Sequence, residues 1–309
     1  MKYAIVFPGQ GSQSLGMLSD LSSNFSIVKD IFSEASDALD LDLWKVLQED
    51  EIALNQTVNT QPVMLAAGYA TFKILSNEVD LSPTCMAGHS LGEYTALVAV
   101  KSLNYFEAVK LVRKRAELMQ SAVPRGNGTM AAIIGLDDEK VIEICAQSNI
   151  SGVVEAVNFN APDQIVIAGE NESVNKACEL MKEAGAKRAL LLPVSVPSHC
   201  SLMNNAAQEF SYSVDAVNFK MGKTNILHNV DASYADDANE IKLKLVEQLC
   251  KPVLWTSSVQ KMQQLGVGKL IELGPGKVLT GLTRRIDKSL SSFAVFDTAT
   301  VQSTIEEIS

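Results

Sequence analysis

The chain has 309 residues, 47% of them hydrophobic and 20% charged, a composition typical of globular proteins that excludes general disorder. Its 26 Lys and Arg against 36 Asp and Glu give a net charge of −10, which argues against nucleic-acid binding because that requires a broad basic surface. The five cysteines are far apart without a C-x-x-C pair, so we expect a reducing compartment and neither a disulfide framework nor a zinc site.

The N-terminus carries too few apolar residues for a signal peptide, because residues 3–7 are followed at once by Pro8 and Gly9. No apolar run approaches the length that spans a bilayer. We therefore expect a cytoplasmic protein with no membrane partner.

Short apolar segments that end in Gly-rich turns alternate with helical stretches in the outer parts of the chain. This pattern predicts an α/β domain with a parallel sheet and helices on its faces. The predicted strands are 3–7, 84–87 and 269–273, the region 17–77 is predicted to be mostly helical, and an apolar helix is predicted over 94–100.

The middle of the chain predicts a smaller unit with the element order β-α-β-β-α-β, which is the ferredoxin-like signature. We place this inserted domain at 126–196 and the larger α/β domain at 1–125 and 197–309. The predicted strands are 130–136, 153–157, 164–168 and 188–194, the helices are 137–147 and 173–184, and Asn160-Ala161-Pro162-Asp163 is predicted to separate the two central strands.

The segment Gly88-His89-Ser90-Leu91-Gly92 fits G-x-S-x-G, the nucleophile elbow. The motif needs a serine at a sharp strand-to-helix turn, and it lies here between a predicted strand and an apolar helix. The N–H of Leu91, at the helix N-terminus, is then a ready donor for an oxyanion. The alternative is a helix N-cap serine in a glycine turn.

A nucleophilic serine needs a base, and the chain has three histidines. His89 adjoins Ser90, and adjacent side chains in a tight turn rarely face each other; His228 lies at what could be a strand end. We predict His199, which follows Pro197 and comes after the serine in the chain, as in hydrolase-like folds; the alternative is a hydrogen-bonded loop histidine. No acid is placed to orient it, so a backbone carbonyl is expected there, and Cys200 is interpreted as a small buried residue.

The segment 105–120 predicts an amphipathic helix with one anomalous residue. Its apolar stripe includes Val109 and Val112, but Arg115 projects among apolar side chains and has no acid three or four residues away. A guanidinium on an apolar face is costly unless it is paired. Its partner is either a remote Asp or Glu or a substrate carboxylate held bidentately.

Two phosphate-binding patterns fail on spacing. Gly9-Gln10-Gly11 follows a strand but lacks the third glycine of a dinucleotide fingerprint, since position 14 is Ser14. Lys277 follows Gly274-Pro275-Gly276 without P-loop spacing.

Five motifs in this order resemble the malonyl-CoA:acyl-carrier-protein transacylases of type II fatty-acid synthesis, over nearly the whole chain. They are Val6-Phe7-Pro8-Gly9-Gln10-Gly11-Ser12-Gln13, Gly88-His89-Ser90-Leu91-Gly92-Glu93-Tyr94, Val157-Asn158-Phe159-Asn160, Val196-Pro197-Ser198-His199 and Glu272-Leu273-Gly274-Pro275-Gly276. The resemblance implies an α/β-hydrolase-like core with a ferredoxin-like insertion. It also assigns roles: Ser90 as nucleophile, His199 as base, Gln10 and Leu91 as oxyanion-hole donors, Arg115 as ligand of the malonyl carboxylate, and Gln248 as the residue whose backbone carbonyl orients the histidine.

The chemistry implied by this resemblance is ping-pong transfer of a malonyl group from malonyl-CoA, through malonyl-Ser90, to the phosphopantetheine thiol of acyl carrier protein. It needs no metal or redox cofactor, and we expect a monomer. A hydrolase with the same elbow and a non-catalytic dinucleotide-binding protein remain the alternatives. Because both partners are acidic, a basic patch is expected to steer docking; the possible clusters are Lys110, Arg113 and Lys114, Lys187-Arg188, and Arg284-Arg285.

Overall fold

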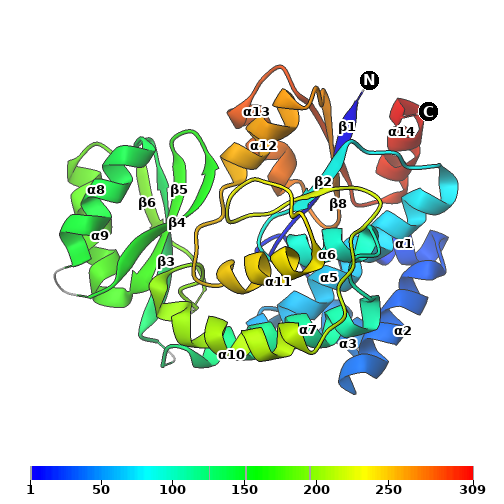
Figure 1. Ribbon diagram of the computed structural model, residues 1–309, viewed down its shortest axis with the longest axis horizontal. Coiled ribbons are helices and arrows are strands. Elements are labelled where there is room, and N and C mark those ends of the chain that lie inside the picture. The colour runs from blue at the N-terminus through cyan, green and yellow to red at the C-terminus, as the bar shows by residue number, and fades with distance from the viewer. Residues whose placement is uncertain (1, 125, 150–151, 195, 309) are drawn as a thin grey trace.

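The computed structural model describes residues 2–124, 126–149, 152–194 and 196–308. Two sheets organise these residues, one parallel and one antiparallel, and they lie in two units side by side (Figure 1). The mixed α/β class predicted from the sequence is thereby confirmed.

The larger unit is built on a five-stranded parallel sheet with the strand order β7-β2-β1-β8-β9. Strand β1 lies at its centre and pairs with β2 on one side and β8 on the other. The strands are β1 (Tyr3–Phe7), β2 (Cys85–Gly88), β7 (Ile226–Leu227), β8 (Lys269–Leu273) and β9 (Ser291–Val295).

Helices bury both faces of this sheet, which is why its central strands are apolar throughout. Alternate side chains of a strand point to opposite faces. Ile5 and Phe7 enter the cluster formed with α2, α5, α6 and α7, whereas Ala4 and Val6 enter the cluster formed with α12 and α13. The helices of the larger unit are α1 (Ser19–Asn24), α2 (Ile27–Leu39), α3 (Leu43–Glu49), α4 (Glu51–Leu54), α5 (Thr57–Glu78), α6 (Gly92–Ala99), α7 (Tyr105–Ser121), α10 (Asn204–Asp215), α11 (Ala238–Glu247), α12 (Trp255–Gln264), α13 (Val278–Ile286) and α14 (Thr298–Ile308).

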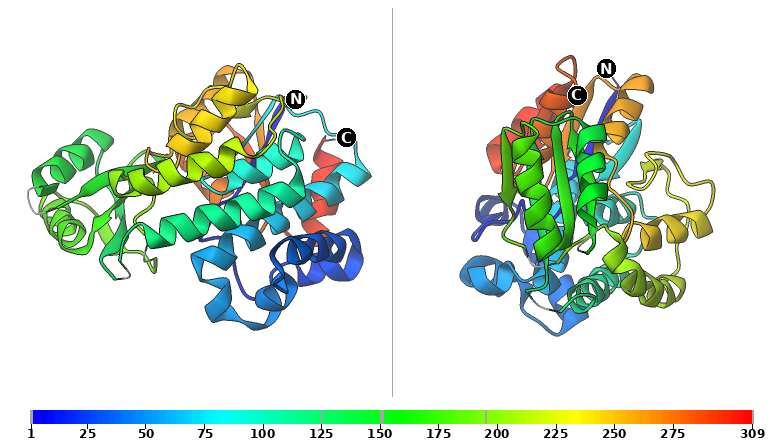
Figure 2. Two further views of the ribbon diagram at one scale, coloured as in Figure 1. Left: turned by 60° about the horizontal axis from the view of Figure 1, so that its bottom comes forward. Right: turned by 90° about the vertical axis from the view of Figure 1, so that its left-hand side faces the viewer.

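The smaller unit is a four-stranded antiparallel sheet with the order β4-β5-β3-β6. Helices α8 and α9 cover the face turned away from the larger unit (Figure 2) and share a separate apolar cluster with that face. The opposite face packs on Cys200 of the larger unit. Its elements are β3 (Gly128–Ile134), α8 (Asp138–Ser148), β4 (Val154–Ala161), β5 (Gln164–Glu170), α9 (Asn171–Glu183) and β6 (Arg188–Leu191).

In the smaller unit, the largest departures from the predicted boundaries are at the C-terminal ends of two strands, where the predictions were wrong by three or four residues. Strand β4 continues to Ala161, so Asn160 belongs to the strand and only Pro162 and Asp163 form the turn. Two register shifts interrupt the pairing of β4 with β5, and Asn158 bridges to Val253 of the larger unit. These irregularities break the apolar alternation that would have shown the strand. Strand β6 ends at Leu191, earlier than the predicted 194.

None of the helices in the described ranges combines the length and the apolar character that a bilayer crossing requires.

Candidate active site

Ser90 lies in a strained turn between β2 and α6. Its φ is 50°, in the left-handed region that costs a non-glycine residue roughly 1–3 kcal/mol. Gly92 makes the turn possible, because a Cβ there would lie 2.1 Å from the Phe7 carbonyl oxygen. Asn229 secures both ends: its Oδ1 accepts the Ser90 N–H at 2.6 Å, and its Nδ2 donates to the Gly88 carbonyl at 2.7 Å. The serine is thus held in an elbow and remains half-buried.

His199 is in hydrogen-bonding contact with this serine, the Ser90 Oγ to His199 Nε2 distance being 2.8 Å. Its Nδ1 lies 2.6 Å from the backbone carbonyl of Gln248. Because a carbonyl can only accept, Nδ1 carries the proton and Nε2 is free to accept the serine proton. His199 also has a positive φ of 66°, and its N–H donates to the Leu249 carbonyl at 3.0 Å.

The Gln248 carbonyl stands at the end of helix α11, where the negative end of the helix dipole favours a cation. A backbone group therefore occupies the place of a triad acid. Burial and the nearby Arg115 cation lower the pKa of His199 to about 3, against the raising effect of the Gln248 carbonyl. The imidazole is accordingly neutral near pH 7, as a general base must be. Cys200 is fully buried, and burial raises its pKa to about 12.

Two backbone N–H groups lie beside the serine and could donate to a bound oxyanion. Within the described residues, neither the Gln10 nor the Leu91 N–H donates to an internal acceptor. The loop that carries Gln10 runs directly over the elbow, since a Cβ on Gly9 would lie 2.5 Å from the His89 carbonyl oxygen. This loop does not open a helix, because the next helix begins only at Ser19. That arrangement disfavours a dinucleotide site, which needs a helix N-terminus at this point.

Arg115 on α7 projects into the same site and is only 1% exposed. Its Nη2 donates to Ser90 Oγ at 3.2 Å and to Gln248 Oε1 at 2.9 Å, and its Nη1 donates to Gln61 Oε1 at 2.8 Å. The guanidinium lies 5.5 Å from the centre of the Tyr94 ring. No carboxylate in the described ranges forms an ion pair with it, and its buried Nε has no acceptor there.

The other two histidines have partners elsewhere. His89 Nε2 lies 2.8 Å from Asn160 Oδ1 of β4, so this contact joins the two units beside the serine. His228 Nδ1 lies 2.7 Å from the carboxylate of Glu93, and both side chains are buried. The predicted site residues Gln10, Ser90, Leu91, Arg115, His199 and Gln248 are thus brought together, with neither of these histidines on the serine oxygen.

Sequence reasoning missed Gln61, Glu93 and Asn229 as parts of this site. Asn229 and Glu93 are separated from their partners by well over 100 residues along the chain. No local pattern marks such contacts. Only the position of Glu93 directly after the elbow motif could have drawn attention to it.

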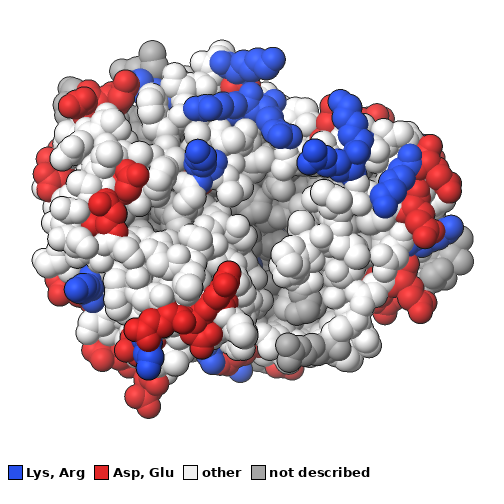
Figure 3. Space-filling view, turned by 180° about the vertical axis from the view of Figure 1, so that it is seen from behind, with Lys and Arg blue, Asp and Glu red and all other residues white. Residues whose placement is uncertain are grey.

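Two of the predicted basic clusters lie near each other. Arg285 of α13 donates to Gln164 at 3.0 Å, and Gln164, Ile134 and Arg188 occupy paired positions on β5, β3 and β6. Two strand spacings of about 4.8 Å therefore separate Gln164 and Arg188, so Lys187-Arg188 and Arg284-Arg285 lie at the same end of the small sheet. Figure 3 shows the molecule from behind, and most Lys and Arg side chains on the face seen there gather along its upper edge, above a hollow in the surface.

The third cluster, on α7, is partly engaged in internal contacts. Arg113 pairs with Glu117 at 2.8 Å and donates to Asn59 at 2.8 Å. Lys110 lies 4.3 Å from the centre of the Phe106 ring.

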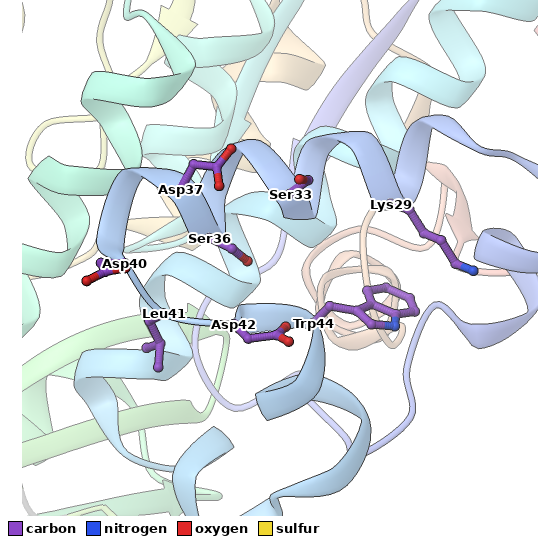
Figure 4. Close-up of a pocket in the computed structure, with 8 residues that line it drawn as sticks. All are labelled: Lys29, Ser33, Ser36, Asp37, Asp40, Leu41, Asp42 and Trp44. Carbon is purple, nitrogen blue, oxygen red and sulfur yellow. The ribbon is translucent and has the colours of Figure 1, made fainter.

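A separate concavity between α2 and α3 contains none of the predicted site residues (Figure 4). It is lined by Lys29, Ser33, Ser36, Asp37, Asp40, Leu41, Asp42 and Trp44. Within the described parts of the chain, no three His, Cys, Asp or Glu side chains are grouped so that they could hold a metal ion.

The class of protein follows from comparison with known families. The family described as "Acyl transferase domain" matches residues 4–302. The chain therefore belongs to the acyl transferase family and is an acyltransferase.

Individual relatives with high sequence identity carry more specific names within this family. Proteins named malonyl CoA-acyl carrier protein transacylase from Haemophilus influenzae and Escherichia coli K12 are 50% and 46% identical to this chain, over 96% and 99% of both chains. Among solved structures, a chain of "type II PKS acyl-carrier protein in complex with its malonyl-transacylase" is 47% identical with a TM-score of 0.98, covering 99% of this chain and 100% of that chain. An acyl carrier protein S-malonyltransferase from Vibrio cholerae is 50% identical with a TM-score of 0.96, covering 98% of this chain and 100% of that chain.

Proposed function

We propose that this acyltransferase moves a malonyl group from malonyl-CoA to the phosphopantetheine thiol of acyl carrier protein, through a malonyl-Ser90 intermediate. The observation that carries the proposal is the guanidinium of Arg115, which is buried, touches Ser90 Oγ and forms no ion pair with a carboxylate of the described residues. A buried cation is stabilised by an anion in direct contact, and an acyl group with a terminal carboxylate supplies one while its thioester carbon lies near the serine. The names of the relatives point to the same substrates.

In the first half of the reaction, Ser90 Oγ attacks the thioester carbon as His199 Nε2 takes its proton. The 2.8 Å contact and the neutral imidazole are suited to this transfer. The N–H groups of Gln10 and Leu91 stabilise the tetrahedral oxyanion. When the C–S bond breaks, the imidazolium returns the proton to the CoA thiolate, and malonyl-Ser90 remains.

In the second half, the phosphopantetheine thiol gives its proton to His199 and attacks the malonyl ester. The tetrahedral intermediate is held by the same two N–H groups, and the proton returns to Ser90 Oγ as the ester bond breaks. The Gln248 carbonyl keeps the imidazole oriented throughout. These steps involve only proton and acyl transfer, so they require no metal or redox cofactor.

We propose a division of the chain into two domains. The segment 126–196 is a ferredoxin-like domain inserted into an α/β-hydrolase-like core of 1–125 and 197–309. The order β4-β5-β3-β6, two helices on one face and a separate apolar cluster support this division. The His89–Asn160 contact then crosses the domain interface beside the nucleophile.

Intact mass measured after brief mixing with malonyl-CoA tests the proposal. The wild-type protein should gain one malonyl group, which Ser90→Ala should not accept. Addition of a pantetheine thiol or holo-acyl carrier protein should then discharge the adduct much faster than water does. Fast discharge by water alone would instead identify a hydrolase, and absence of any adduct would refute the assignment of Ser90.

A further inference from the structure

The reaction described above makes no use of Glu93, a fully buried carboxylate in the first turn of α6. Its Oε2 accepts the Asn229 N–H at 3.0 Å and the Gln248 Nε2–H at 2.8 Å, and its Oε1 lies 2.7 Å from the His228 Nδ1. A backbone N–H and an amide NH2 can only donate. With the ring proton of His228 on Nδ1, all three partners donate, an arrangement that suits an ionised carboxylate because such a group only accepts.

The side chain of Gln248 links this carboxylate to Arg115. Its Oε1 accepts from Arg115 Nη2 at 2.9 Å, while its Nε2 donates to Glu93 at 2.8 Å and to the Ser90 carbonyl at 3.1 Å. A guanidinium only donates and a carboxylate only accepts, so the two ends dictate which way the amide faces. The result is a buried cation and a buried anion separated by one amide group.

We propose that Glu93 is the counter-charge of Arg115, held one amide away so that it balances the charge of the guanidinium without occupying its N–H groups. This inference rests on the proposed function, in which Arg115 binds the acyl carboxylate. Glu93 acts through Gln248 and is therefore a positioning residue that sets the selectivity for carboxylated acyl groups.

The physical reason lies in how a buried charge is compensated. A carboxylate in direct contact with Arg115 would compete with the acyl carboxylate for the same N–H groups. A carboxylate one amide away leaves those groups free, yet its field is weakly screened because the interior excludes water. Burial lowers the pKa of the Arg115 guanidinium, and Tyr94 and Glu93 oppose that effect.

The variant Glu93→Gln tests the role of the charge. A glutamine can keep every contact when the ring proton of His228 moves to Nε2, with its Oε1 accepting from Asn229 and Gln248 and its NH2 donating to His228 Nδ1. Only the negative charge is lost, so the acyl carboxylate becomes the sole counter-ion of Arg115. We expect the ratio of kcat/KM for malonyl-CoA to that for acetyl-CoA to rise by about 3- to 30-fold, and malonylation to raise the Tm more than in wild type.

The direction of this change makes it diagnostic. Structural damage would lower both activities and would not raise the malonyl preference. A ratio that stays equal to the wild-type value or falls, in a Glu93→Gln protein with native circular dichroism, would overturn the inference.

A second variant moves the charge instead of removing it. Glu93→Gln combined with Gln248→Glu keeps the total charge and the carbonyl of residue 248, but places the carboxylate directly on Arg115. We expect the malonyl-to-acetyl ratio to fall about tenfold or more below wild type, because the guanidinium is now occupied. A ratio at or above the wild-type value would contradict the proposal.

Glu272→Gln is the matched control. Glu272 is an equally buried carboxylate, but it accepts the N–H groups of Leu279 and Thr280, and no hydrogen bond among the described residues links it to Arg115. The malonyl-to-acetyl ratio should stay at the wild-type value even if the Tm falls. A rise like that of Glu93→Gln would mean that lost stability alone alters selectivity and would overturn the inference.

The two proposals fail in different ways. A wild-type protein without malonyl preference would refute the proposed function itself. Wild-type malonyl preference that is unchanged in Glu93→Gln would refute only this inference.

Discussion

Replacing Arg115 by alanine should remove the selectivity for malonyl groups while preserving acyl transfer. Malonyl-CoA would lose its charge partner at the far end of the acyl group, whereas acetyl-CoA has no carboxylate to lose. In the wild-type protein, acetyl-CoA also leaves the buried guanidinium without a carboxylate in direct contact, so acetyl transfer should be slow. We therefore expect Arg115→Ala to lower kcat/KM for malonyl-CoA and to leave that for acetyl-CoA unchanged or raised.

The size of the effect follows from the surroundings of the guanidinium. Arg115 is 1% exposed, and Gln61, Gln248 and Ser90 are its hydrogen-bond acceptors among the described residues. A bidentate, charge-assisted contact with a guanidinium this deeply buried contributes about 2–4 kcal/mol to binding. At about 1.4 kcal/mol for each factor of ten, kcat/KM for malonyl-CoA should fall by roughly 30- to 1,000-fold.

The assay is single-turnover acylation of the protein with each CoA ester, followed by transfer to a pantetheine thiol. Arg115→Lys serves as the graded variant, because an ammonium keeps the charge but cannot form the planar two-point contact. It should recover only part of the malonyl activity. Thermal unfolding of each variant checks that the fold is intact.

The competing explanation is that Arg115 mainly stabilises the fold. Alanine would leave the buried Oε1 atoms of Gln61 and Gln248 without this donor, which costs about 1–3 kcal/mol for each unsatisfied group. That explanation predicts a lower Tm and equal losses on both CoA esters. Parallel losses in a folded Arg115→Ala protein would refute the carboxylate-binding role.

Three further predictions concern the base, its titration and docking. His199→Ala should slow formation of the malonyl adduct by roughly 10²- to 10⁴-fold, measured by rapid-quench mass spectrometry; a rate near wild type would exclude it as the base. Because burial and then Arg115 lower the pKa of His199 from 6.5 to about 3, the acid limb of acylation after a pH jump should lie well below pH 6.5. This acid limb should move to higher pH in Arg115→Ala, and a wild-type limb at pH 6.5 would contradict the reasoning. The contribution of the neutral His199 to the free energy of unfolding, present above pH 6.5, should be lost as the pH falls toward 3. Reversing Arg284 and Arg285 to Glu should raise KM for acyl carrier protein but not for free pantetheine, and equal effects on both acceptors would indicate damage to the site instead.

Much of the framework could be predicted from local sequence. Strand β1 matches the predicted 3–7 and β8 the predicted 269–273, and α7 begins at the predicted Tyr105. These segments carry strong apolar periodicity, and their ends are marked by glycine, proline or a capping residue. Strand β9 was missed because it begins with two serines, and β7, which has only two residues, was indicated only by the possible strand end at His228.

The same local information identified the elbow around Ser90 and the anomalous position of Arg115. Both are properties of a few neighbouring residues: a turn that needs small side chains, and a helix face that should be apolar. The helical wheel left the partner of Arg115 open between a remote acid and a substrate. The structure shows amide and hydroxyl acceptors around it instead, with Glu93 one amide away.

Composition, periodicity and short motifs were enough to predict the α/β class, the order of elements in the two units and the candidate site residues. Tertiary packing brings distant groups together: Asn229 at the elbow, the Gln248 carbonyl on His199, and the Gln248 amide between Arg115 and Glu93. The physical reason is that periodicity and motifs report interactions between neighbours in the chain. These hydrogen bonds join residues 49 to 155 positions apart, and their geometry exists only once the helices have packed against the sheet.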